Sequence, residues 1–330
     1  MSIPASPSDF ALPLLQLDDV CVDFQVPKAQ GGKATLRAVR NVSLQVMPGE
    51  SIALVGESGC GKSTLGRVMV GLIEPSRGSV LYRGRAMNAL NRRDQQSARR
   101  MLQMVFQNPY GALDPRFRIH RSVREPLDIA GLGSRAERRE KVARVLGLVG
   151  LGPRHAAAYP KQLSGGQLQR VGIARAIVTS PEVLVCDEVT SALDVSAKIQ
   201  ITELLVELGR ELNVSYVFIS HDLGIVRQVA TRIAVMYLGR IVELMDAASF
   251  YRGALHPYSR ALLNSVPIPD PQLQRDRLSK ILVGEVPSPT DPPSGCAFRS
   301  RCPLAQNICR EVDPALTPRK GSHLVACHFC

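Results

Sequence analysis

A glycine-rich run near the start of the chain combines residue types that bind phosphate. It follows an apolar run at 51–55 and precedes a helix-like segment at 65–70, which is the order strand, loop, helix. Glycines let backbone N–H groups close around phosphate oxygens, and a helix N-terminus adds partial positive charge. Lys62 is placed to reach the β- and γ-phosphates, and Ser63 to offer its hydroxyl to Mg²⁺. This phosphate loop, which predicts a nucleoside triphosphate site, consists of Gly56, Glu57, Ser58, Gly59, Cys60, Gly61, Lys62, Ser63 and Thr64.

Two adjacent carboxylates follow a second apolar run, farther along the chain. The hydrophobic stretch at 183–186 has the length of a buried strand, and Asp187 and Glu188 come directly after it. Open α/β sheets bind ligands at the carboxyl ends of their strands. A carboxylate there can hold Mg²⁺, directly or through water, and its neighbour can take a proton from attacking water. Together with the phosphate loop, this pair predicts hydrolysis of the bound nucleotide.

Alternating strands and helices are expected to position these two motifs. A βα alternation of this kind predicts a parallel sheet with right-handed crossovers. We interpret the mainly helical stretch at about 108–165 as an insertion into the α/β core, and the strand at 14–23 as an edge strand. The expected strands are 14–23, 36–46, 51–55, 79–82, 101–106, 183–186, 215–219 and 233–237, and the expected helices are 65–70, 119–130, 136–148, 166–179, 195–212 and 223–229.

The charge balance allows several kinds of partner. The 330 residues include 41 basic and 29 acidic side chains, a net charge of +12, which could favour nucleic acid, an anionic membrane surface or triphosphates. The basic cluster at 135–144 is interleaved with Glu137 and Glu140, which favours a solvated helix face. Without tryptophan or interleaved aromatics, a stacking platform for single-stranded nucleic acid is not expected. No segment approaches the roughly 18 apolar residues of a membrane span, and residues 1–9 lack the basic region of a signal peptide.

The last part of the chain differs in composition from the rest. Seven prolines between Pro267 and Pro293 favour an extended linker, and five of the eight cysteines follow it. In a chain without an export signal, this crowding favours metal binding over disulfides. Four thiolates suit Zn²⁺ or an iron–sulfur cluster, with buried free cysteines and a disulfide pair as the alternatives. The four candidate ligands are Cys296, Cys302, Cys309 and Cys327, and Cys330 or His328 could replace Cys327.

The segment between the helical insertion and the carboxylate pair resembles the signature of ABC ATPases. It consists of Leu163, Ser164, Gly165, Gly166 and Gln167. The other landmarks of that family follow in order. Gln107 is similar to the Q-loop glutamine, Ser191–Asp194 to the D-loop, His221 to the switch histidine, and Phe24 to the aromatic residue on which adenine stacks. One departure is Val189, where many members have proline.

The resemblance implies an α/β fold: a P-loop ABC ATPase core with a parallel sheet, an antiparallel β subdomain and a helical insertion, followed by the Cys-rich tail. ATP and Mg²⁺ would bind, with Ser63, Gln107 and Asp187 near the metal. Glu188 would be the general base, and His221 would orient water and the γ-phosphate. Two cassettes would pack head to tail, so that Ser164, Gly166 and Asp194 of one lie near the ATP held by the other.

Three further segments narrow the resemblance to ATP-binding subunits of bacterial oligopeptide, dipeptide and nickel importers. They are residues 107–115, 159–162 and 256–263, and the cysteine tail resembles these subunits as well. Similar subunits imply a [4Fe–4S] cluster in the tail, with Zn²⁺ as the alternative. They also imply a second, paralogous ATP-binding subunit, two transmembrane permease subunits and a periplasmic or extracellular substrate-binding protein, with no nucleic-acid partner.

We therefore expect a peripheral subunit on the cytoplasmic face of the inner membrane that powers peptide import. The expected division is a disordered lead at 1–13, an ABC ATPase domain at 14–265, and a Pro-rich linker with a Cys-rich extension at 266–330. Import of nickel or another small solute is one alternative, and a soluble ABC ATPase acting on nucleic acid is another. The intact Glu188 and His221 argue against a regulatory subunit with little turnover.

Overall fold

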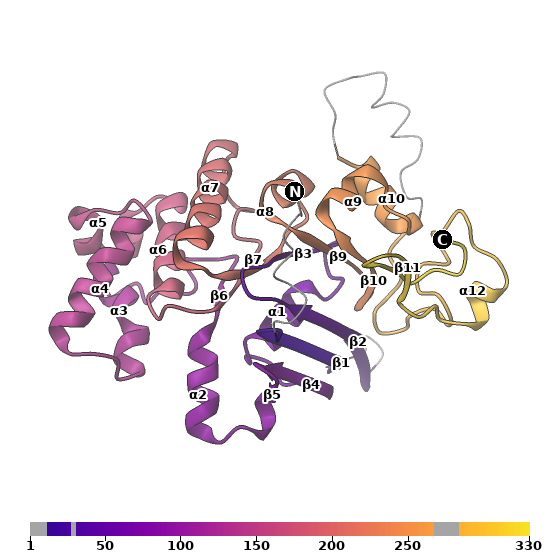
Figure 1. The fold of residues 1–330 in the computed structure, drawn as a ribbon, viewed down its shortest axis with the longest axis horizontal. Coiled ribbons are helices and arrows are strands. Elements are labelled where there is room, and N and C mark those ends of the chain that lie inside the picture. Colours follow the sequence, from indigo (N-terminus) through magenta and orange to yellow (C-terminus); the bar gives the residue numbers. More distant parts are fainter. Residues whose placement is uncertain (1–11, 28–30, 267–283) are drawn as a thin grey trace, which may run out of the picture.

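The computed structural model describes residues 12–27, 31–266 and 284–330, and it contains two β-sheets and a set of helices (Figure 1). The smaller sheet is antiparallel, with strand order β2-β1-β4-β5. Because β1 pairs on both sides, the expectation of an edge strand at 14–23 is wrong. Register shifts in β1 after Leu17 and Val20 interrupt the alternation of buried side chains, which made this strand resemble an edge. Its strands are β1 (Leu15–Pro27), β2 (Lys33–Val46), β4 (Arg77–Tyr82) and β5 (Arg85–Ala86).

The larger sheet has the order β11-β12-β10-β9-β3-β8-β7-β6. Its five strands from β9 to β6 are parallel, whereas β10, β12 and β11 join antiparallel at the other edge. The parallel part agrees with the expected βα alternation. The strands are β3 (Ser51–Val55), β6 (Leu102–Val105), β7 (Val183–Asp187), β8 (Ser215–Ile219), β9 (Arg232–Tyr237), β10 (Arg240–Asp246), β11 (Thr317–Lys320) and β12 (His323–Val325).

Both faces of the larger sheet are buried. In β3, Ile52 and Leu54 pack with the smaller sheet and α1 (Lys62–Met69), whereas Ala53 and Val55 belong to a second core on the other face. Successive side chains of a strand point to opposite faces, so the apolar residues 52–55 serve both cores. The second core includes residues of α6 (Gly165–Ile177), α7 (Val195–Leu212) and α8 (Leu223–Val229).

The helical insertion lies at one end of the molecule, on the left of Figure 1. It contains α3 (Ile119–Ile129), α4 (Arg135–Leu148), α5 (Pro153–Ala157) and the short 3-10 helix η2 (Pro160–Gln162). The sequence did not predict α2 (Arg92–Met101), because nearly all of its side chains are polar and only Ala98 is buried. Consequently the strand expected at 101–106 begins one residue later, as β6. The short 3-10 helix η1 (Met87–Ala89) precedes α2.

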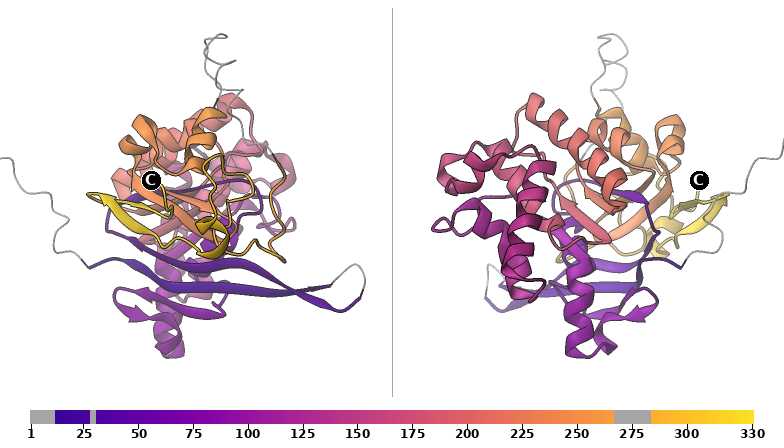
Figure 2. Two further views of the ribbon diagram at one scale, coloured as in Figure 1. Left: turned by 90° about the vertical axis from the view of Figure 1, so that its right-hand side faces the viewer. Right: turned by 60° about the vertical axis from the view of Figure 1, so that its left-hand side comes forward.

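The C-terminal tail folds against the opposite end of the core (Figures 1 and 2). It follows α9 (Ala247–Gly253) and α10 (Pro257–Asn264), contains α12 (Ile308–Glu311), and adds β12 to β10. Residues 284–293 of the expected linker have no regular structure, as predicted, whereas 1–11 and 267–283 lie outside the described residues. Of the helices in the described part of the chain, none combines the length and the apolar character needed to cross a membrane.

Candidate nucleotide-binding site

The phosphate loop joins the end of β3 to the start of α1, as the sequence predicted. Gly61 is the residue before α1 and has φ +102°, and Gly56 has φ +151°. A Cβ at Gly61 would lie 2.2 Å from the carbonyl oxygen of Ala38, and one at Gly56 would lie 2.2 Å from that of Met236. Both positions therefore require glycine, for backbone conformation and for space.

The side chain of Lys62 curls back into the loop. Its Nζ donates hydrogen bonds to the carbonyl oxygens of Gly56 at 2.8 Å and Glu57 at 2.9 Å, and it lies 3.6 Å from Cys60 Sγ. Lys62 is only 5% exposed. Burial raises the pKa of the Cys60 thiol, so this neighbour does not provide a thiolate partner. The ammonium group is thus held at the loop by neutral acceptors, where a phosphate oxygen would be a stronger partner.

Ser63 and Asp187 meet beside Lys62. Ser63 Oγ donates a hydrogen bond of 2.8 Å to Asp187 Oδ1. Asp187 is buried, and burial raises the pKa of its carboxyl group. A hydroxyl and a carboxylate are the hard oxygen ligands that Mg²⁺ takes, and a divalent cation would offset the cost of the buried charge. The donor set at this point therefore fits Mg²⁺.

The three predicted catalytic side chains meet, because Gln107 and His221 both contact Glu188. Gln107 Nε2 donates to Glu188 Oε2 at 2.8 Å, and His221 Nδ1 lies 3.4 Å from Glu188 Oε1. Gln107 follows β6, Glu188 follows β7 and His221 follows β8, so all three come from the carboxyl edge of the parallel sheet. Glu188 has φ +46°, an uncommon value for a side chain of this size. The Ser191 hydroxyl donates to its carbonyl oxygen at 2.9 Å.

A cavity of about 270 Å³ lies between the phosphate loop and Glu188, and neither His221 nor Asp187 is among the residues that line it. Phe24, which is 36% exposed, forms one of its walls, as expected for a residue that stacks on a base. Pro289 of the C-terminal tail also contributes, and its carbonyl oxygen accepts a hydrogen bond from the backbone N–H of Arg37. The sequence offered no signal for Pro289. The predicted residues that line the cavity are Phe24, Ser58, Gly59, Gly61, Lys62, Ser63, Thr64, Gln107 and Glu188.

The signature segment lies elsewhere, at the start of α6. Ser164 Oγ accepts from the Gln167 N–H at 3.3 Å and Gln167 Oε1 accepts from the Ser164 N–H at 3.0 Å, which is a capping box. A Cβ built on Gly165 would lie nearest Leu193, and one on Gly166 nearest Ala197, so the segment borders the D-loop. Asp194 caps α7 by accepting from the Ala197 N–H at 2.9 Å. None of these residues lines the described nucleotide cavity.

The tail cysteines lie in one region of the structure. Burial raises the pKa of the Cys302 thiol to about 11, with smaller contributions from the thiolates of Cys296, Cys327 and Cys309. The backbone N–H of Cys296 also donates to the carbonyl oxygen of Cys309. Within the part of the chain that the structure describes, no three His, Cys, Asp or Glu side chains are arranged to hold a metal ion. The cluster predicted from the sequence therefore stays a prediction.

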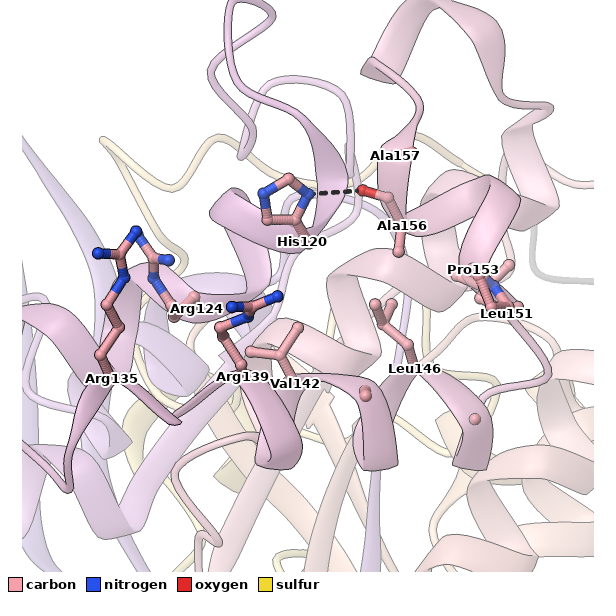
Figure 3. A pocket seen from close by; sticks show the side chains of 13 residues that line it. His120, Arg124, Arg135, Arg139, Val142, Leu146, Leu151, Pro153, Ala156 and Ala157 are labelled. Carbon is pink, nitrogen blue, oxygen red and sulfur yellow. Dashed lines mark hydrogen bonds between the residues drawn. The ribbon is translucent and has the colours of Figure 1, made fainter. Parts of the chain in front are cut away.

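A larger cavity, of about 680 Å³, lies within the helical insertion (Figure 3). Its apolar lining comes from residues such as Val142 and Leu146, and Arg124 and Arg139 lie at its edge. Arg124 already pairs with Asp128 at 2.8 Å. The cavity lies among α3, α4 and α5, away from the phosphate loop, so it is not the nucleotide site.

Comparison with known proteins agrees with this geometry. The ABC transporter family matches residues 39–191, and the family described as the oligopeptide/dipeptide transporter C-terminal region matches residues 242–309. A dimeric structure of the ATP-binding cassette MJ0796, in a post-hydrolysis state with ADP and Pi, superposes with a TM-score of 0.63 at 31% identity. The match covers 71% of this chain and 98% of that one. The fold and the site thus define an ATP-binding cassette of the ABC transporter class.

Relatives along the whole chain define the family within that class. The oligopeptide transport ATP-binding protein AppF of Bacillus subtilis is 43% identical over 96% of this chain and 97% of its own length. The oligopeptide transport ATP-binding protein OppF of Escherichia coli is 43% identical over 95% of each chain. The chain belongs to the family of oligopeptide transport ATP-binding proteins.

Proposed function

We propose that this chain is the ATP-hydrolysing subunit that powers the import of peptides through a membrane permease. The convergence of Gln107 and His221 on Glu188, beside the phosphate loop, is the observation that carries the hydrolytic part. The oligopeptide transport relatives and the matching C-terminal region support the peptide substrate. In this proposal, residues 14–265 form the ATPase domain, and 266–330 form the linker and extension.

The proposed chemistry assigns one role to each group. ATP would lie in the cavity with its base on Phe24, and Lys62 would exchange its carbonyl partners for β- and γ-phosphate oxygens. Ser63, Asp187 and Gln107 would hold Mg²⁺, which when bound neutralises phosphate charge. The Glu188 carboxylate would accept a proton from attacking water, while His221 holds that water in line with the γ-phosphate.

The first experiment measures ATP turnover and solute uptake by the chain assembled with its permease. Oligopeptide or dipeptide should stimulate ATP hydrolysis and should accumulate inside vesicles, whereas nickel should do neither. Uptake of nickel with no response to peptides would contradict the peptide substrate. Co-purification with nucleic acid in place of a permease would contradict transport altogether.

The signature segment supports a composite ATP site. Ser164 and Gly166 lie outside the nucleotide cavity of their own chain. If a second cassette packs head to tail with this chain, Ser164 and Gly166 would contact the ATP bound to the second cassette. We infer that the partner is a paralogous ATP-binding subunit. Both cassettes would belong to a complex with two permease subunits and a substrate-binding protein, and would lie on the cytoplasmic face of the membrane. Mass analysis of the purified native complex tests this. Two copies of this chain with no second cassette would contradict it.

The tail cysteines support a structural metal site. Four thiols lie in one region, which is a donor set that fits a [4Fe–4S] cluster or Zn²⁺. They belong to Cys296, Cys302, Cys309 and Cys327. The group would fix the tail on the core and would take no part in hydrolysis. Anaerobic purification followed by iron, sulfide and zinc analysis tests the site. Stoichiometric zinc without sulfide would contradict the cluster, and absence of any metal would contradict the site.

A further inference from the structure

The C-terminal tail forms a direct ion pair with the phosphate loop. Arg301 Nη1 donates to Glu57 Oε2 at 2.7 Å, and Arg301 Nη2 donates to Glu57 Oε1 at 2.9 Å. This two-pronged geometry is the strongest that a guanidinium and a carboxylate can form. The two residues are 244 positions apart in the sequence, and Glu57 is the second residue of the loop.

The pair is protected from solvent and supported by aromatic packing. The side chain of Arg301 is 6% exposed and that of Glu57 is 28% exposed, so water screens the pair less than it would on an open surface. Phe298, three residues before Arg301, is buried and packs on Tyr237 and Tyr258, with ring centroids 5.2 Å and 5.4 Å apart. These contacts fix the tail at the point from which Arg301 reaches the loop.

All three polar parts of Glu57 are occupied in this arrangement. Its backbone N–H donates to the hydroxyl of buried Tyr258 at 2.7 Å, and its carbonyl oxygen accepts from Lys62 Nζ at 2.9 Å. Its carboxylate is held by Arg301. One residue of the loop therefore connects the tail to the ammonium group that the proposed function assigns to the phosphates.

The negative charge of Glu57 would affect the binding of ATP. A carboxylate in a loop that receives a triphosphate repels the ligand, and the repulsion is strong in a partly buried site. The Arg301 guanidinium cancels that charge. Neither Arg301 nor Glu57 lines the nucleotide cavity, but Lys62 does and its Nζ bonds to the Glu57 carbonyl oxygen, so Arg301 acts through Glu57 and its contact with Lys62.

We propose that Arg301 is a positioning residue for ATP binding, which neutralises Glu57 and holds the loop in its binding conformation. The inference rests on the proposed function, because it takes the ligand to be ATP. In this inference the tail is part of the nucleotide site, in addition to any role that the tail has in binding a metal. Nucleotide affinity then depends on a segment that is remote in sequence from every motif of the cassette.

The test measures the dissociation constant of ATP for the full-length chain, with equilibrium binding of a fluorescent ATP analogue. Arg301→Gln leaves Glu57 charged and unpaired, and it should weaken binding about tenfold or more. Glu57→Gln in the same chain removes the repulsion, so the double variant should bind within about threefold of wild type. Arg310→Gln is the matched control, because it removes an exposed charge from the same tail and should change affinity less than about twofold.

The double variant separates positioning from a merely structural role. It keeps two amides of similar shape in place of the ion pair, so it also provides the test if Arg301→Gln alone is too unstable to purify. Unchanged affinity in Arg301→Gln, or a double variant about tenfold or more weaker than wild type, would overturn the inference. If wild-type protein binds no ATP, the proposed function fails and this inference fails with it.

Discussion

Replacing Glu188 by glutamine should separate ATP hydrolysis from ATP binding. Glu188 accepts a hydrogen bond from Gln107 at 2.8 Å and lies 3.4 Å from His221, with its side chain 18% exposed. Glutamine has nearly the same shape but cannot take up a proton at neutral pH. A positioned general base contributes about 10²- to 10⁴-fold to a rate, so kcat should fall by that factor, a barrier increase of about 3–5 kcal/mol. Binding should be retained, because Lys62 and Asp187 are unchanged.

The assay compares phosphate release with ATP affinity in the purified complex. Glu203→Gln serves as the matched control, since it neutralises an exposed carboxylate on α7 that does not line the cavity. The Glu188→Gln variant should also accumulate with ATP bound, in a closed pair of cassettes. Hydrolysis at the wild-type rate in Glu188→Gln would refute the assignment of Glu188 as the base.

Three further changes have defined outcomes. Lys62→Ala should abolish detectable ATP binding in an equilibrium binding assay, because it removes the buried ammonium group of the phosphate loop. Phe298→Ala should lower the free energy of unfolding by about 3–5 kcal/mol in a denaturant titration, since Phe298 is 1% exposed and packs on two tyrosines. Burial lowers the pKa of His256 to about 4, below its ordinary 6.5, so the unfolded chain binds this proton first. The contribution of His256 to the free energy of unfolding is therefore fully present above pH 6.5, and it falls by about 3 kcal/mol as the pH drops to about 4. The His256→Asn variant should lack this part of the acid dependence. Unfolding curves measured across that pH range test the prediction.

Much of the core could be predicted because its elements carry local signals. The helices at 195–212 and 223–229 and the strand at 215–219 have the bounds expected from periodicity. By contrast, α2 has a polar surface on nearly all sides. The short strand β12 is stabilised by pairing with β10, and β11 by pairing with β12. Such elements depend on tertiary contacts that the local sequence does not record.

The candidate site likewise has one part that could be predicted from the sequence and one part that could not. Asp187 ends β7, and Gln107, Glu188 and His221 follow β6, β7 and β8. Because these neighbouring strands are parallel, the meeting of the four residues at their carboxyl ends follows from topology. The Arg301 contact with the phosphate loop could not be predicted, because it depends on how the tail folds back over the core. No spacing rule relates residues that are 244 positions apart.

The central claim is that ATP hydrolysis at this site drives peptide import. Its most direct test is the uptake of a radiolabelled oligopeptide into vesicles that contain the complete complex, with wild-type chain or Glu188→Gln. We predict accumulation against a concentration gradient in the wild type with ATP supplied on the cassette side, and loss of accumulation in the variant despite normal ATP binding. Equal accumulation by both proteins, or accumulation without ATP, would contradict it.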